Sequence, residues 1–369
     1  MLAVTENTLS ARRPTLSLDV SILSIATAVP GHVVSQADTA ERAKKLWPQY
    51  AQFDSLYMNT GIERRFACEP IDWYYGTYGW EERSEAFRRH AVPLLEEAAQ
   101  GAIAKAGLVV TDIDAVVVNT VTGIAVPSLD ALLFNRMPFR PDTERLPIFG
   151  FGCGGGVAGL SRAARIAESM PGANVLFLTV DLCTLCLRLE DQSLAMFISA
   201  ALFGDGAAAV VLRKGATQTT DGARNNGAVA RVAATGEHLW PGTEHIMGWD
   251  IKHDGFGIVI SPQIPTLVDR KLAPALDGFL TKHGLTLADF DGFLIHPGGR
   301  KVLEMAQAVL GVSDGDVVHS WQVLRDYGNM SAGTALFVLE QAIRSGARGR
   351  HLFSAFGPGF SAYFAVLDL

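Results

Sequence analysis

The chain lacks the segments that would carry it into or across a membrane. No apolar run among its 369 residues approaches the ~18 residues that a membrane-spanning helix needs. Residues 1–17 carry Glu6, Arg12 and Arg13 ahead of any apolar segment, whereas a secretory signal places its charge first and its apolar run second. We therefore expect no membrane span and no cleaved leader, and we interpret residues 1–17 as a flexible N-terminal arm.

Cysteine and clustered positive charge are also scarce. The four cysteines, at positions 68, 153, 183 and 186, are too few for a disulfide scaffold in a chain of this length, which favours a cytoplasmic, reducing location. The net charge is -7 and no stripe of Lys and Arg occurs, so we expect no nucleic-acid partner. Cys183 and Cys186 form a C-x-x-C pair without a second pair or a His pair at ligand spacing. We predict no metal site. A redox dithiol formed by these two cysteines is an alternative that the sequence supports only weakly.

What the chain does have is an internal repeat. Residues 105–121, KAGLVVTDIDAVVVNTV, resemble residues 282–298, KHGLTLADFDGFLIHPG, at an offset of 177. Residues 151–180 resemble residues 327–356 at an offset of 176. FGDGAAAVVL from residue 203 resembles FGPGFSAYFAVL from residue 356, at the smaller offset of 153. Three pairs in the same order indicate a duplication, and the smaller offset indicates an insertion near residues 181–202 in the first half.

The repeated units predict an α/β fold. Their strands, such as NVLFLTV and GFLIHP, are continuous apolar runs, which are typical of sheets buried on both faces. Glycine breaks and amphipathic helical runs alternate with these strands. We predict an N-terminal half, residues 18–220, and a similar C-terminal half, residues 221–369, with the boundary in the polar stretch 213–228.

The duplication places three chemically suited residues at strand ends or helix starts that face one region. Cys153 aligns with Asn329, and both follow a glycine and open a helix, while His296 ends the strand GFLI. A helix N-terminus and a nearby imidazolium would lower the pKa of a cysteine and make Cys153 a nucleophile. Asn329 would donate to a developing oxyanion. Taken singly, a cysteine or a histidine is more often structural. Taken together, the three favour catalysis.

These residues also carry a family resemblance. The motifs GFGCGGG, HPGG, YGNMS, ALFGDGAAA and FGPGF resemble those of type III polyketide synthases, the chalcone-synthase-like members of the thiolase superfamily. The match runs from about residue 20 to the C-terminus. MGWDI and LCTLC further resemble bacterial members that make alkylresorcinols, alkylpyrones or phloroglucinols.

The resemblance implies a homodimer with a thiolase-like, five-layered αβαβα fold. It implies that Cys153 takes an acyl starter as a thioester and that His296 and Asn329 bind malonyl-CoA, whose decarboxylative condensation extends the chain. CoA thioesters would be the substrates, with no metal or other cofactor. An acyl carrier protein remains open as the donor of the starter.

The resemblance also assigns residues to the substrate. Phe203 and Phe256 match gatekeeper phenylalanines, although core packing is the commoner role of any phenylalanine. The remaining cavity residues would be Thr122, Cys183, Cys186, Met247, Ser331, Gly357, Pro358, Gly359 and Phe360. Plant members grip CoA with basic residues in the segment that corresponds to 52–60, which has none here, so Arg64, Arg65, Arg300 and Lys301 are the substitutes we expect.

Apolar replacements in the expected cavity favour a fatty acyl starter and an alkylresorcinol or alkylpyrone product. Condensation of malonyl-CoA alone to phloroglucinol or a related phenol is the alternative within the family. A ketoacyl-ACP-synthase-like condensing enzyme is a second alternative. A non-catalytic homologue that binds acyl-CoA is a third, against which the intact set of Cys153, His296 and Asn329 argues.

Overall fold

The computed structural model describes residues 18–53, 55–215 and 227–369. The predicted arm, residues 1–17, and the predicted boundary at 220/221 lie outside the described residues. The strands are β1 (Val20–Ala28), β2 (His32–Ser35), β3 (Arg64–Ala67), β4 (Ile113–Thr120), β5 (Glu144–Phe149), β6 (Asn174–Leu182), β7 (Asp205–Lys214), β8 (Ala230–Leu239), β9 (Met247–Lys252), β10 (Gly255–Ile260), β11 (Gly292–Ile295), β12 (Arg350–Gly357) and β13 (Ser361–Asp368).

The α-helices are α1 (Gln36–Leu46), α2 (Ser55–Met58), α3 (Trp80–Lys105), α4 (Leu129–Phe134), α5 (Gly155–Ser169), α6 (Leu194–Leu202), α7 (Ile264–His283), α8 (Arg300–Leu310), α9 (Val318–Tyr327) and α10 (Ala332–Arg344). The short 3-10 helices are η1 (Pro48–Phe53), η2 (Ile71–Tyr75), η3 (Val110–Asp112), η4 (Gly152–Gly154), η5 (Cys183–Cys186), η6 (Leu287–Asp289) and η7 (Asp314–Val317).

Two sheets meet at one short contact. In the described residues the strands run in the order β11-β12-β13-β8-β1-β7-β6-β4-β5. Only Val20–Ile22 of β1 pair with β8, whereas β1 pairs with β7 along its whole length. The continuous order therefore consists of a first sheet, β5-β4-β6-β7-β1, and a second sheet, β8-β13-β12-β11, joined at one corner.

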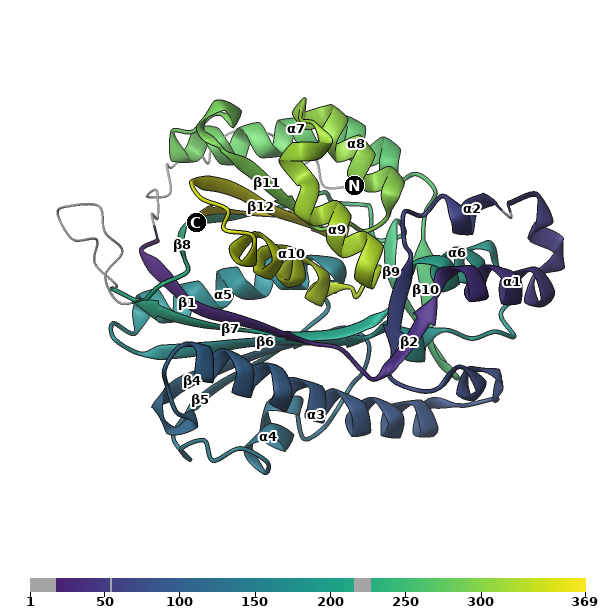
Figure 1. The fold of residues 1–369 in the computed structure, drawn as a ribbon, viewed down its shortest axis with the longest axis horizontal. Helices are drawn as coiled ribbons and strands as arrows, with labels where there is room; N and C mark the ends of the chain where they lie inside the picture. Colours follow the sequence, from purple (N-terminus) through teal and green to yellow (C-terminus); the bar gives the residue numbers. More distant parts are fainter. Residues whose placement is uncertain (1–17, 54, 216–226) are drawn as a thin grey trace, which may run out of the picture.

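Helices α5 and α10 fill the space between these sheets (Figure 1). A single apolar cluster joins α5 and α10 to residues of both sheets, including Phe177 of β6 and Phe353 of β12. Helix α3 covers the outer face of the first sheet, and α7 and α8 cover the outer face of the second. The layers are thus helix, sheet, helices, sheet, helix, which confirms the αβαβα fold class.

The repeat seen in the sequence corresponds to repeated elements. Strand β4, helix α5 and strands β6 and β7 follow one another in the first half as β11, α10, β12 and β13 do in the second. The expected insertion forms η5 and α6, whereas only residues 358–360 connect β12 to β13. All nine residues of β6 are buried, as the continuous apolar run predicted.

A smaller group of elements lies beside the ends of the sheets, at the right of Figure 1. We call α1, α2, α6, β9 and β10 the cap. Its own apolar cluster includes Trp47, Tyr57 and Phe197, and the rings of Trp47 and Tyr57 each contact that of Phe197 edge to face. The insertion therefore contributes α6 to the cap rather than to the layered core.

Close contact between α5 and α10 depends on glycine. A Cβ added at Gly156 would lie 2.3 Å from the carbonyl oxygen of Ala332, the first residue of α10. At Gly155 it would lie 2.5 Å from the side-chain nitrogen of Asn119. Real Cβ atoms do not approach backbone oxygens so closely, so any larger residue at Gly156 has to push the two helices apart.

We expect Gly156→Ala to destabilise the protein by about 1–3 kcal/mol, the usual effect of overpacking a well-filled core. Equilibrium unfolding in guanidinium chloride measures this change. The control is Gly278→Ala in α7, where a Cβ meets nothing within 4 Å. That change should be neutral or stabilise by up to about 1 kcal/mol, because alanine is the better helix former. Equal stability of the two variants would contradict the close-contact argument.

Candidate active site

A cavity of about 480 Å³ lies where the cap meets the ends of the sheets and the central helices. Its wall contains Cys153, His296 and Asn329, so the structure brings together the three residues that the sequence placed in one region. The volume falls in the range typical of small-molecule sites, about 300–1,000 Å³.

Cys153 lies in the 3-10 turn η4, directly ahead of α5. Its neighbour Gly152 has a φ of 51°, and a Cβ there would lie 2.6 Å from Pro358. Glycine is therefore required at this position, both for the backbone conformation and for the approach of Pro358. The turn places the thiol in the cavity wall.

Asn329 is held by the backbone on both sides of its amide. Its Nδ2 donates to the carbonyl oxygen of Gly298 at 3.0 Å, and its Oδ1 accepts from the amide of Ser331 at 2.8 Å. Both side-chain atoms lie 3.9 Å from Sγ of Cys153. One N–H of the amide is thus fixed, and the other is directed to the region of the thiol.

His296 follows β11 and is almost fully buried. Among the described residues neither ring nitrogen has a hydrogen-bond partner. A Cβ added at Gly298 would lie 3.6 Å from Nε2 of His296 and 4.0 Å from Nδ2 of Asn329, so the two side chains lie on the same side of the loop. A buried imidazole without a protein partner in the cavity wall is available to a substrate.

Burial sets the charge state of these groups. Burial raises the pKa of the Cys153 thiol to about 11, against weaker opposing hydrogen bonds from Ser331 and Asn329. Burial lowers the pKa of His296 to about 3. Each group alone is therefore neutral at neutral pH. The expected lowering of the thiol pKa is therefore wrong for the resting site.

The cavity wall includes seven of the fifteen predicted substrate and CoA residues. Besides the three central residues, it contains Phe203, Cys183, Met247, Ser331, Pro358, Arg300 and Lys301. Aliphatic side chains dominate the rest of the wall. They include Leu56, Ile198, Leu202, Ile258, Ile260, Ile264 and Val302.

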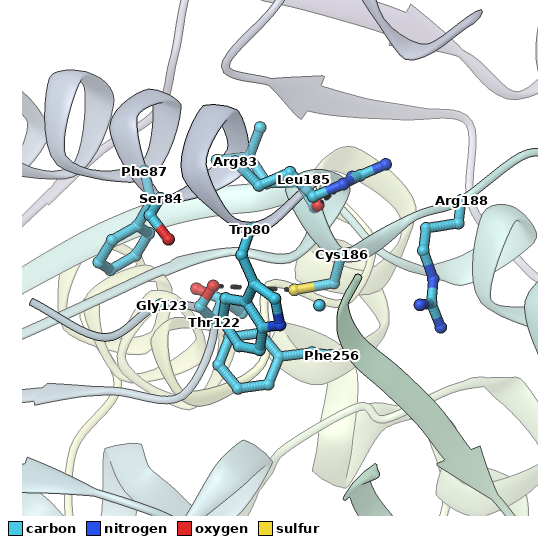
Figure 2. A pocket seen from close by; sticks show the side chains of 11 residues that line it. Trp80, Arg83, Ser84, Phe87, Thr122, Gly123, Leu185, Cys186, Arg188 and Phe256 are labelled. Atoms are coloured by element: carbon cyan, nitrogen blue, oxygen red, sulfur yellow. Dashed lines mark hydrogen bonds between the residues drawn. The ribbon is translucent and has the colours of Figure 1, made fainter. Parts of the chain in front are cut away.

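Three predicted substrate residues lie in a different place. Thr122, Cys186 and Phe256 line a separate small pocket together with Trp80 and Arg83, as Figure 2 shows. Phe256 itself does not line the Cys153 cavity, but its ring lies 5.7 Å from that of Trp249, which does, so its role as a gatekeeper stays a prediction.

Each of the three side chains contacts residues outside the Cys153 cavity. Phe256 packs edge to face on Trp80. The hydroxyl of Thr122 donates to Asp181, and the thiol of Cys186 lies 3.8 Å from the carbonyl oxygen of Thr122. Ile258, two residues after Phe256, lines the cavity instead.

The FGPGF loop reaches the cavity through Phe356 and Pro358. A Cβ at Gly357 would lie 2.6 Å from the carbonyl oxygen of Phe151, and Gly359 adopts a φ of +114°. Phe360 is fully buried and stacks on Phe356 and Trp240. Gly357, Gly359 and Phe360 thus shape the loop and its core, and they are not part of the wall.

The two predicted pairs of basic residues differ in position. Arg300 and Lys301, at the start of α8, lie in the cavity wall. Arg65 is buried, and its guanidinium donates to the carbonyl oxygens of Ala200 and Phe203. Because these bonds hold Arg65 inside the protein, its predicted contact with CoA is wrong. Arg64 is exposed but does not line the cavity.

Asp181 was not among the site residues predicted from the sequence. This carboxylate is fully buried at the end of β6 and accepts the amides of Val121 and Ala332. The signal was present, because Asp181 directly follows the apolar run NVLFLTV, and a charge at the end of a buried strand needs partners. Val121, which donates its amide to Asp181 and lines the cavity, could also have been predicted, because it ends an apolar run in the sequence.

The described residues contain neither a candidate metal site nor a candidate membrane-spanning helix. No group of three or more His, Cys, Asp or Glu side chains is placed to hold a metal ion in them. None of the helices in the described part of the chain is both long and apolar enough to cross a bilayer.

Comparison with known proteins identifies the family. Residues 67–216 match the N-terminal domain model of chalcone and stilbene synthases, and residues 231–366 match the C-terminal domain model of the same family. The chain belongs to this family. It is a type III polyketide synthase, a Claisen-condensing acyltransferase.

Individual relatives cover nearly the whole chain. A 1,3,6,8-tetrahydroxynaphthalene synthase of Streptomyces peucetius is 38% identical over 99% of this chain and 97% of its own. An alpha-pyrone synthesis polyketide synthase of Mycobacterium tuberculosis is 28% identical over 94% of this chain and 91% of its own.

A solved structure gives the same result. The 1,3,6,8-tetrahydroxynaphthalene synthase of Streptomyces coelicolor, a bacterial type III polyketide synthase, superposes with a TM-score of 0.87 at 30% identity. The match covers 94% of this chain and 99% of that one.

We expect His296→Gln to move the alkylation of Cys153 to higher pH than in the wild-type synthase. Without the imidazole, no proton acceptor offsets the burial that raises the thiol pKa, so the thiolate forms only in more alkaline solution. The rate of iodoacetamide modification, followed by intact mass across a pH series, measures the change. Cys153→Ala identifies the labelled site. Identical pH profiles for wild type and His296→Gln would show that the imidazole does not stabilise the thiolate.

Proposed function

We propose that this type III polyketide synthase loads an aliphatic acyl starter on Cys153, extends it with malonyl-CoA and closes the product to an alkylresorcinol or alkylpyrone. The observation that carries the proposal is the mainly aliphatic wall of the cavity that holds Cys153, His296 and Asn329. Such a wall stabilises a hydrocarbon chain and offers few polar partners to a phenolic starter.

Loading begins with the neutral pair. The Cys153 proton passes to His296, and the thiolate attacks the carbonyl carbon of the acyl thioester. The C–S bond to CoA then breaks, and the leaving CoA thiolate takes the proton back from the imidazolium. Because both charges appear and disappear together, the buried site never carries an isolated charge for long.

Extension uses the same residues as hydrogen-bond donors. Neutral His296 and the second N–H of Asn329 would bind the malonyl thioester oxygen. When the carboxylate leaves as CO₂, its electron pair forms an enolate, and these donors oppose the charge that builds on the oxygen. The enolate carbon attacks the Cys153 thioester and its C–S bond breaks, so that the cysteine leaves as a thiolate, which attacks the next acyl thioester or takes a proton from water. The aliphatic wall would exclude water from this step.

We expect the aliphatic wall to discriminate between acyl starters by their chain length. Each methylene removed from water contributes about 0.8 kcal/mol, which is about fourfold in affinity. We therefore expect KM for acyl-CoA starters to fall with chain length until the cavity is full. A starter longer than that should gain nothing further.

The decisive assay incubates the purified synthase with malonyl-CoA alone and with straight-chain acyl-CoAs of increasing length. We expect mass spectrometry to show products that contain the starter plus malonyl-derived units, and we expect none with Cys153→Ala. Absence of any product longer than its starter would overturn the proposal. A strict requirement for carrier-protein thioesters would instead favour a ketoacyl-ACP-synthase-like enzyme, and saturable acyl-CoA binding without turnover would favour a binding protein.

Condensation of malonyl-CoA alone is the second candidate. Its support is the relative of Streptomyces peucetius, whose name gives 1,3,6,8-tetrahydroxynaphthalene, a polyphenol, as its product. The same assay separates the two, because a phenol formed equally fast with and without acyl-CoA would favour this candidate.

We propose that CoA binds to basic residues at the start of α8. Arg300 and Lys301 lie in the cavity wall and are exposed, with Arg300 paired to Glu304 at 2.7 Å. Phosphate oxygens of CoA would find two positive charges there. Exposed pairs of this kind contribute up to about 1 kcal/mol each in water.

We expect Lys301→Ala to raise KM for malonyl-CoA by up to about fivefold, the equivalent of about 1 kcal/mol, with kcat unchanged. The effect should shrink in high salt, which screens exposed charges. Arg64→Ala is the matched control, since Arg64 is equally exposed but lies outside the cavity wall. Steady-state kinetics measure both. An equal rise in the two variants would place the CoA elsewhere.

A homodimer is supported by the edge of the first sheet. Strand β5 ends the sheet order, and its Leu146 and Phe149 are exposed. Val126 on a neighbouring loop is 94% exposed. An apolar edge strand of this kind is a template for pairing with another chain, and a second copy would cover it. The cytoplasmic location stays a prediction from the composition.

A further inference from the structure

Asp181 lies at the junction of the two halves. Its Oδ1 accepts the amide of Val121 at 2.8 Å, together with the hydroxyls of Thr120 and Thr122, all at the end of β4. Its Oδ2 accepts the amide of Ala332, the first residue of α10, at 3.0 Å. One carboxylate thus ties the Cys153 half of the molecule to the Asn329 half.

The residue between Asn329 and this tie is conformationally unusual. Ser331 has a φ of 51° and is the one non-glycine residue with a positive φ in the described chain. Such a conformation persists only where its surroundings fix it. On one side Ser331 donates its amide to Oδ1 of Asn329, and on the other side the next amide is bound to Asp181.

These contacts form a chain from the carboxylate to the reacting atoms. Asp181 fixes the amide of Ala332, which fixes the backbone of Ser331. The Ser331 amide then fixes Oδ1 of Asn329 at 2.8 Å, which leaves Nδ2 facing Sγ of Cys153 and Gly298. An Asn side chain can turn by half a rotation with little change in shape, so its orientation has to be set by its partners.

We propose that Asp181 is a positioning residue that sets the orientation of the Asn329 amide, and thereby its hydrogen bond to the malonyl thioester oxygen. This inference rests on the proposed function of Asn329. Asp181 does not touch the substrate in this assignment, because it does not line the cavity and acts through Ala332 and Ser331.

The charge of Asp181 fits this role. Burial raises its pKa to about 6, so the carboxylate is still mainly ionised at neutral pH. Among the described residues it forms no ion pair, and it accepts two backbone amides and two threonine hydroxyls. A hydrogen bond from the Ser331 side chain also opposes the rise in its pKa. An acceptor of this kind can hold several donors at once, which a neutral amide cannot.

The chain offers a matched control in Asp205. It is equally buried, burial raises its pKa to about 6 as well, and it accepts two backbone amides and one hydroxyl. Its partners are Cys68 and Thr184, and neither connects to the Asn329 amide. Loss of either carboxylate should therefore cost stability, but only loss of Asp181 should misorient Asn329.

The test is Asp181→Asn beside Asp205→Asn, assayed well below the unfolding midpoint of each. An asparagine here sets an NH₂ group against one of the two amides that Asp181 accepts. We expect acyl-Cys153, measured by intact mass after addition of acyl-CoA, to form to the wild-type extent. Release of CO₂ from malonyl-CoA should fall about ten- to hundredfold, as a misplaced donor would cause.

Asp205→Asn should keep both rates even if its unfolding midpoint falls. If Asp181→Asn does not fold, Asp181→Glu keeps the charge but displaces it, and the same split between loading and CO₂ release is expected. Wild-type CO₂ release in a folded Asp181 variant, or an equal loss of both steps, would overturn the inference. Absence of extension in the wild-type synthase would instead overturn the proposed function.

Discussion

The contact between α5 and α10 is the constraint on which the rest of the molecule depends. These helices lie between the two sheets, and each starts at a catalytic segment, Cys153 ahead of α5 and Asn329 ahead of α10. Gly155 and Gly156 let the helix starts approach to a distance that no larger residue allows. The same packing that joins the halves therefore brings thiol and amide within 3.9 Å. Stability and catalytic geometry have a common origin here.

Burial then determines what these groups can do. It keeps the cysteine and the histidine neutral at rest, and it raises the pKa of the nearby carboxyl of Asp181. A neutral imidazole can donate one hydrogen bond to a substrate oxygen and accept one proton from the thiol. Since a charge in the cavity is costly until a second charge accompanies it, the site favours steps in which charge moves over a short distance.

Much of this could be predicted from the chain alone, because duplication makes position informative. The offset of 176 residues aligned Cys153 with Asn329, and the apolar runs indicated sheets buried on both faces. The extent of the cavity along a strand could not be predicted in the same way. Phe256 and Ile258 lie on the same face of β10, yet only Ile258 lines the cavity. Likewise Arg65 appeared to be a surface cation, and only its backbone partners show that it is buried.

The insertion after β6 has a consequence for how such enzymes diversify. It supplies Cys183, Ile198 and Leu202 to the wall but none of the three central residues, and the second half has no counterpart between β12 and β13. Mutations in this one segment can therefore alter the shape of the cavity, while the catalytic residues stay on the duplicated elements. Variation in this part of the chain, which the second half lacks, would change the products without touching the catalytic residues.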